Sequence, residues 1–110
     1  MKGDRVGEFE ELALLAILGL DNDAYGVTVQ ERLERESRRE ISLGAVYAAL
    51  DRLERKGYVH STLGDVIGER GGKRRRLFTV TAAGLEAVRD ARRTRDALWN
   101  GVPRALRGRS

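Results

Sequence analysis

The sequence predicts one α+β domain, mainly helical, in which three helices are followed by a β-hairpin and a fourth helix. Apolar residues recur at helical spacing over three early segments and one late segment. In contrast, residues 58–62 and 76–80 are β-branched or aromatic with polar alternation, as in paired strands. A length of 110 residues leaves room for one modest core.

The first helix is expected at residues 8–20. Glutamates occupy its first turn, where the helix dipole favours negative charge, and we expect the Glu10–Glu11 pair to be solvated or to cap the helix. Apolar residues then follow almost all round, which is typical of a central core helix. Residues 21–23 end it.

The second helix is expected from Tyr25 or Gly26 to Glu36, with Tyr25, Val29 and Leu33 on its buried face. Its other face carries charges of both signs, which pair locally on a solvated surface.

The third helix is expected from Leu43 to Lys56. Ser42 is a good N-cap, and Gly57 is suited to the position that ends a helix. Its buried stripe comprises Val46, Ala49, Leu50 and Leu53.

A basic hairpin follows, with the glycine-rich stretch 64–72 as its turn, and Thr81 then caps a helix at residues 82–100. A helix followed by a basic hairpin is the order of a winged helix-turn-helix DNA-binding fold. We therefore predict a winged-helix domain at residues 8–81, a C-terminal dimerisation helix at 82–100 packed on it, and a basic tail at 101–110.

Basic residues are concentrated in the C-terminal part of the chain. Residues 1–69 carry 9 basic and 14 acidic side chains (net −5), whereas residues 70–110 carry 12 basic and 3 acidic (net +9). A polyanion approaching one side of the molecule would account for this asymmetry, since phosphate neutralisation supplies most of non-specific nucleic-acid affinity.

Small side chains mark the start of the third helix. They let its N-terminus, with exposed N–H groups and the positive dipole end, approach DNA phosphates. Tyr47 could donate its hydroxyl to a phosphate or pack against the second helix, and Arg52 could reach base edges or backbone. The candidate DNA-binding residues here are Ser42, Gly44, Ala45, Tyr47, Ala48 and Arg52.

Four consecutive basic residues, Lys73, Arg74, Arg75 and Arg76, lie on the second arm of the hairpin. Alternate strand residues face opposite sides, so about half of these charges can face DNA at once. Like charges in a row repel one another and favour an anion. We therefore predict that this wing contacts nucleic acid, following phosphates or entering a minor groove, and is not merely a solvated charge run.

The fourth helix has too thin an apolar stripe for one small core to stabilise it fully, so we expect it to pair with a second chain. Trp99, the only tryptophan, is then either an interface anchor or the wall of an apolar effector site between protomers. The residues assigned to the dimer interface or effector site are Phe9, Leu12, Leu85, Val88, Leu98 and Trp99.

Nothing in the sequence favours catalysis, a metal or a cofactor. Cysteine is absent and His60 is the only histidine, which argues against thiolate and zinc sites. Ser61 beside His60 lacks an orienting acid, and the glycines before Lys73 lack phosphate-loop spacing. The longest apolar run, Leu12 to Leu20, is too short to cross a bilayer, and we expect a cytoplasmic protein without enzymatic activity.

Several blocks together resemble the PadR family of bacterial transcriptional regulators, in the family's order and spacing across about residues 9–85. They are YG at 25–26, ISLGAVYAAL at 41–50, RLE at 52–54, KGYV at 56–59, GGKRRRLF at 71–78 and TAAG at 81–84.

The resemblance implies a winged-helix homodimer that binds an inverted repeat in a promoter and usually represses it. It implies that Tyr47 and the start of the third helix lie at the major groove, with residues 73–76 in the wing. The single fourth helix resembles the short branch of the family, in which this helix pairs with the first helix of the partner. Some short members sense hydrophobic compounds at that interface.

We therefore predict a sequence-specific DNA-binding regulator, a repressor acting as a homodimer, with release by a hydrophobic small-molecule effector left open. Two alternatives remain at this point. One is an architectural protein that binds DNA with little sequence preference. The other is a winged-helix module whose basic hairpin binds an acidic protein.

Overall fold

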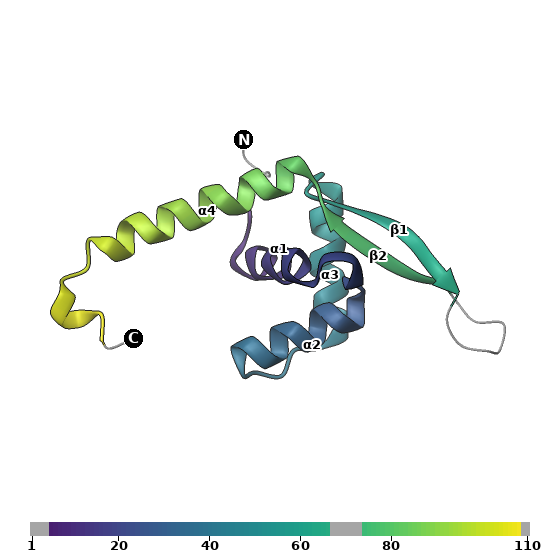
Figure 1. Cartoon of the computed structure of the whole chain (residues 1–110), viewed down its shortest axis with the longest axis horizontal. Helices are drawn as coiled ribbons and strands as arrows, with labels where there is room; N and C mark the ends of the chain where they lie inside the picture. The colour runs from purple at the N-terminus through teal and green to yellow at the C-terminus, as the bar shows by residue number, and fades with distance from the viewer. Residues whose placement is uncertain (1–4, 67–73, 109–110) are drawn as a thin grey trace.

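Three helices, a two-stranded hairpin and a long fourth helix make up the fold (Figure 1). The structure, a computed structural model, describes residues 5–66 and 74–108, and all their side chains except those of residues 65, 66 and 74. The helices and strands are α1 (Glu8–Leu20), α2 (Gly26–Ser37), α3 (Leu43–Arg55), β1 (Val59–Val66), β2 (Arg74–Val80) and α4 (Ala82–Asn100). Two short 3-10 helices, η1 (Asp21–Asp23) and η2 (Arg104–Leu106), follow α1 and α4. The predicted order of elements is confirmed.

Local sequence signals fix the ends of α3 and α4. The Ser42 hydroxyl accepts a hydrogen bond from the Ala45 N–H at 3.0 Å, and the Thr81 hydroxyl accepts one from the Gly84 N–H at 3.0 Å, as N-caps do. Gly57, at φ +80°, has the left-handed conformation that ends a helix, so it turns the chain from α3 into the hairpin.

The core forms where α1 contacts α2, α3, α4 and β2. This central position of α1 agrees with the prediction from its nearly continuous apolar surface. The large side chains that are fully buried are Leu14, Ile17, Val29, Val46, Leu50, Leu53 and Phe78.

The prediction for the Glu10–Glu11 pair was wrong in one respect. Both residues are buried, with exposed fractions of 4% and 6%. They lie on the sides of α1 that face α3 and α4, where cations from those two helices neutralise them. Glu10 also caps α1, since its Oε1 accepts the Gly7 N–H at 2.9 Å, as one of the predicted roles required.

The strands of the hairpin are longer than predicted. Antiparallel pairing runs from Val59 opposite Val80 to Val66 opposite Arg74. The glycine-rich composition between the strands led us to assign too many residues to the turn.

Gly64 lies within β1, close to the segment that precedes α2. A Cβ atom at this position would lie 3.2 Å from the Arg75 carbonyl oxygen and 3.3 Å from Tyr25 Oη, so glycine permits this close packing. The Ala24 carbonyl accepts the Phe78 N–H at 2.9 Å, which attaches the start of α2 to the outer side of β2. The wing is therefore held directly by the helical core.

The two halves of α4 differ in their surroundings. The first half packs on the core through Gly84, Leu85 and Val88, whereas every residue from Arg92 to Asn100 is exposed. Figure 1 shows this second half extending away from the other helices. None of the helices in the described part of the chain combines the length and the apolar character that a membrane crossing requires.

The contact at Gly84 predicts a strong effect of a single methyl group. In Gly84→Ala the new Cβ would lie 2.2 Å from the Tyr58 carbonyl oxygen and 2.9 Å from Val80 Cγ1, so backbone must move. We expect the free energy of unfolding in urea to fall by about 1–3 kcal/mol. The control is Gly44→Ala on α3, where the nearest atom lies 4.0 Å away and helix propensity should add about 0.5–1 kcal/mol. Equal stability of the two variants would contradict the packing assigned to Gly84.

Candidate nucleic-acid interface

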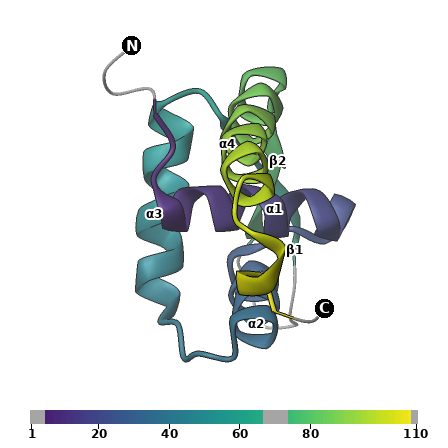
Figure 2. The ribbon, with the colours of Figure 1, turned by 90° about the vertical axis from the view of Figure 1, so that its left-hand side faces the viewer.

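One side of α3 is uncovered along its whole length. Figure 2 shows α3 at an edge of the molecule, with the other helices and the hairpin on its inner side. Helical spacing places Gly44, Ala48 and Arg55 near the middle of the outer side. The exposed residues of α3 are Gly44, Ala45, Ala48, Asp51, Arg52 and Arg55, and we call this set the α3 outer face.

Four predicted DNA-binding residues, Gly44, Ala45, Ala48 and Arg52, are thus brought together. The three small residues follow the Ser42 cap, so the first turns of α3 present backbone with little side-chain bulk. Such a surface can enter a major groove closely, with the positive end of the helix dipole toward phosphate.

Tyr47 lies at the side of α3 that faces α2. A Cβ atom at Gly26 would lie 2.3 Å from Tyr47 Oη, so the tip of the half-buried ring rests on the Gly26 backbone. Packing against the second helix, one of the two interpretations of Tyr47, therefore describes where the ring lies. Its contact with a phosphate stays a prediction.

The two wing arginines with described side chains contact other protein groups. Arg76 Nη2 donates to Glu54 Oε1 at 2.7 Å and to Ser61 Oγ at 3.2 Å, and its Nη1 lies 3.6 Å from Asp51 Oδ1. Arg76 thus joins the base of the wing to α3.

Arg75 lies over the Tyr25 ring, with its guanidinium carbon 4.0 Å from the ring centre, a cation–π arrangement. Its Nε is buried and has no hydrogen-bond partner among the described residues. The backbone of Arg74 pairs with Val66, and Lys73 lies outside the described residues.

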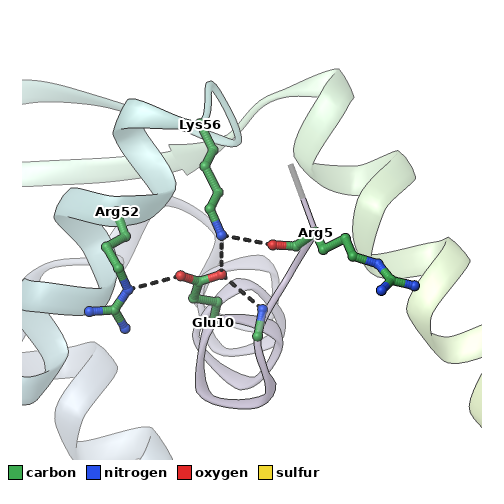
Figure 3. Close-up of polar contacts among 5 residues, drawn as sticks. Arg5, Glu10, Arg52 and Lys56 are labelled. Atoms are coloured by element: carbon green, nitrogen blue, oxygen red, sulfur yellow. Dashed lines mark hydrogen bonds and ion pairs between the residues drawn. The ribbon is translucent and has the colours of Figure 1, made fainter. Parts of the chain in front are cut away.

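A buried carboxylate fastens α3 to α1 (Figure 3). Glu10 Oε2 accepts from Arg52 Nε at 2.9 Å, and Oε1 accepts from Lys56 Nζ at 2.7 Å. Lys56 Nζ also donates to the Arg5 carbonyl oxygen at 2.7 Å. These contacts, with the Gly7 cap, form the Glu10 cluster, which joins the N-terminal segment, α1 and the second half of α3.

The ionisation of Glu10 reflects this environment. Burial alone would raise the pKa of its carboxyl group, because the charged form is poorly solvated. Hydrogen bonds from Lys56, the Gly7 N–H and Arg52 outweigh burial and lower the pKa from 4.5 to about 2. The carboxylate is therefore charged at neutral pH.

Glu10 also orients Arg52. The carboxylate accepts a hydrogen bond from the guanidinium Nε, and Figure 3 shows the two terminal nitrogens of Arg52 directed away from Glu10. The Arg52 side chain is 44% exposed. A fork held in this way has lost part of its rotamer freedom before any anion binds, which favours phosphate binding.

Arg55 was not among the residues predicted to bind DNA. It lies on the α3 outer face, is exposed, and has no polar partner among the described residues. Its helical spacing from Gly44 and Ala48 places it on the same face as these predicted DNA-binding residues. Arg55 is free to meet an anion without first breaking an ion pair.

Most residues assigned to the dimer interface lie in or against the core of their own protomer. Val88 is buried, and Phe9, Leu12 and Leu85 pack against that core. Leu98 and Trp99 remain exposed, at 71% and 51%. The hollow beside Trp99 is lined by Arg104, Arg107 and Gly108, so an apolar effector site there would need walls from a second protomer. In residues 5–66 and 74–108, no three acidic, histidine or cysteine side chains are grouped to hold a metal ion.

The lowered pKa of Glu10 predicts a specific loss of stability in acid. A group whose folded pKa is lowered stabilises the protein above its ordinary pKa, and this contribution disappears as pH falls from 4.5 toward 2. We expect Glu10→Gln to be less stable than the wild type by up to about 3 kcal/mol at pH 7, with the gap closing near pH 2. Urea unfolding at several pH values measures this difference. Glu8→Gln, an exposed residue of the same turn, should cost less than about 1 kcal/mol, and a gap for Glu10→Gln that does not change with pH would contradict the cluster.

Solved structures share this architecture. RosR of H. salinarum is 26% identical with a TM-score of 0.71, and the match covers 89% of this chain and 81% of that one. A PadR-like transcriptional regulator from Bacillus cereus is 22% identical with a TM-score of 0.70, covering 92% and 93%. A PadR family regulator from Eggerthella lenta is 24% identical with a TM-score of 0.63, covering 90% and 87%. The last two likenesses, below 25% identity, establish the winged-helix fold alone.

Among curated protein sequences, none matches this chain. The sequence profile of the PadR-like family of transcriptional regulators matches residues 14–90, which include the α3 outer face, both strands of the wing and the first half of α4. This match extends over well more than half of the chain, and the chain therefore belongs to the PadR-like family of transcriptional regulators.

Proposed function

We propose that this DNA-binding regulator is a cytoplasmic repressor that binds an inverted-repeat promoter site as a homodimer. The observation that carries the proposal is the α3 outer face, where small residues are followed by two outward arginines, Arg52 and Arg55. Small residues admit the helix to a groove, and arginine suits bidentate contact with phosphate or guanine. The Glu10 cluster supports the same conclusion because it orients Arg52 before DNA is present.

The exposed second half of α4 supports the homodimer. Leu98, Trp99 and Leu106 are 71%, 51% and 73% exposed at the far end of the molecule, and Leu18 of α1 is 42% exposed. Tryptophan is favoured at interface centres, where it buries a large apolar surface. A twofold dimer would present two α3 helices about 34 Å apart, which matches half-sites on one side of the duplex.

Two other functions fit part of these observations. An architectural protein would need the basic wing but not the oriented Arg52 of α3. A protein-binding module would use the wing toward an acidic partner, yet Arg75 and Arg76 already contact Tyr25 and Glu54 within the protomer. The α3 outer face therefore favours DNA reading over both.

Selection of sheared genomic DNA by the purified protein at about 0.15 M salt tests the proposal. Sequencing of the retained fragments should show a few intergenic regions sharing an inverted repeat. Diffuse retention would favour the architectural alternative, and no retention would favour a protein partner.

Arg55 should contribute one phosphate contact. In Arg55→Ala we expect the slope of log K against log salt to become shallower by about one unit, because one fewer counterion is released. Titration of a labelled operator at several salt concentrations measures the slope. Arg89→Ala removes an arginine that is also exposed but lies on α4, outside the α3 outer face, and should leave the slope unchanged. Equal slopes for both variants would exclude a phosphate contact by Arg55.

Trp99 should be an anchor of the homodimer. We expect Trp99→Ala to raise the dimer dissociation constant at least about thirtyfold, as truncation of a central interface tryptophan does. Sedimentation velocity over a range of protein concentrations measures this change. The matched control is Leu63→Ala, which removes a 61% exposed apolar side chain from the wing. If both variants dimerise like the wild type, Trp99 lies outside the interface.

A further inference from the structure

One ion pair fastens the outer half of α4 to the rest of the protomer. Arg95 Nε donates to Glu11 Oε1 at 2.9 Å, with the Glu11 side chain 7% exposed and that of Arg95 59% exposed. The other ion pairs of α4 in the described residues, Arg92 with Asp96 and Arg93 with Asp90, stay within the helix. Among the described ion pairs of α4, only Arg95 therefore reaches another helix.

The Arg95–Glu11 ion pair lies beyond the part of α4 that packs on the core. Packing on the core ends near Val88 and the half-buried Ala91, and the helix continues exposed to Asn100. Arg95 lies about 10 Å beyond Val88 along the helix axis. Packing of Gly84, Leu85 and Val88 holds the first half of α4, and the contact at Arg95 adds an attachment further out that limits pivoting of the second half.

A small pivot would have a measurable consequence. The segment from Val88 to Asn100 is about 18 Å long. If this segment rotated by about 10° about Val88, its end would move by about 3 Å, which is close to the rise of one base pair. In a dimer formed through the outer half of α4, this movement of the helix end would change the distance between the two protomers.

The same turn of α1 holds the DNA-reading helix. Glu10 binds Arg52 of α3 and Lys56 at the C-cap of that helix, and its neighbour Glu11 binds Arg95 of α4. Two consecutive buried carboxylates thus fix α3 and α4 relative to one short segment. The angle between reading helix and outer helix depends on both contacts.

We propose that Glu11 and Arg95 are positioning residues that set the separation of the two α3 helices, and thereby the spacer length of the inverted repeat that the dimer prefers. This inference rests on the proposed homodimer. It assigns to the pair a role in DNA selectivity that is separate from contact with DNA.

The test uses the operator found by genomic selection, with its spacer shortened or lengthened by one and two base pairs. Dissociation constants are measured for the full-length wild type, Arg95→Gln, Arg95→Lys and Arg92→Gln. We expect the wild type to prefer one spacer, and Arg95→Gln to reduce that preference at least fivefold. Arg95→Lys, which can keep the ion pair, should retain the preference. Arg92→Gln removes the same charge from the same helix and should retain it too, because its pair with Asp96 is local.

Outcomes that overturn the inference are distinct from failure of the proposed function. If the wild type shows no preference for inverted repeats, or binds them as a monomer, the proposed function fails. If the wild type has a sharp spacer preference and folded, dimeric Arg95→Gln has the same one, the positioning role is wrong. Glu11→Gln breaks the pair from the other side and should broaden the preference equally. Loss of folding in both variants would also overturn the inference, because the pair would then serve stability instead of direction.

Discussion

The buried carboxylate of Glu10 is the interaction on which the arrangement of the other elements depends. A buried charge is costly unless charged partners and hydrogen bonds satisfy it, and removing one partner of such a group typically costs about 3–5 kcal/mol. Glu10 meets this requirement with three donors, the Gly7 N–H that precedes α1, Arg52 of α3 and Lys56 at the end of α3. The requirement for these partners therefore fixes how α3 lies against α1, and with it the direction of the α3 outer face.

Acidic residues in the first part of the chain form ion pairs with basic residues elsewhere and hold them in place. Glu54 and Asp51 bind Arg76 at the base of the wing, and Glu11 binds Arg95 of α4. The net charge of −5 in residues 1–69 therefore does not oppose DNA binding as strongly as the number suggests. Part of that negative charge pairs with arginines and orients them. Arg55, by contrast, has no polar partner among the described residues and lies on the surface that faces DNA in the proposed complex.

Local signals predicted the elements, but not the partners of charged side chains. The caps Ser42 and Thr81 act within a few residues, so the sequence alone placed the starts of α3 and α4 correctly. Glu10 meets Lys56 across 46 positions, and Glu11 meets Arg95 across 84. Periodicity carries no information about such pairs, and the glutamates were therefore expected to be solvated or to cap the helix, not to bind distant cations. Arg55, by contrast, could have been found from helical spacing alone.

The contrast between the two halves of α4 follows from the size of the core. One modest core covers Gly84, Leu85 and Val88, whereas every described residue from Arg92 to Asn100 is exposed, although Arg95 bonds to Glu11 of α1. Pairs within the helix contribute only about 0.2–0.5 kcal/mol each, so they support the outer half weakly. A partner that buries Leu98 and Trp99 would supply the missing stabilisation. Because Glu10 and Glu11 are consecutive residues, the segment that binds Arg95 of α4 is also the segment that holds α3. In the proposed dimer, the geometry of the dimer and the direction of α3 would therefore both depend on one turn of α1.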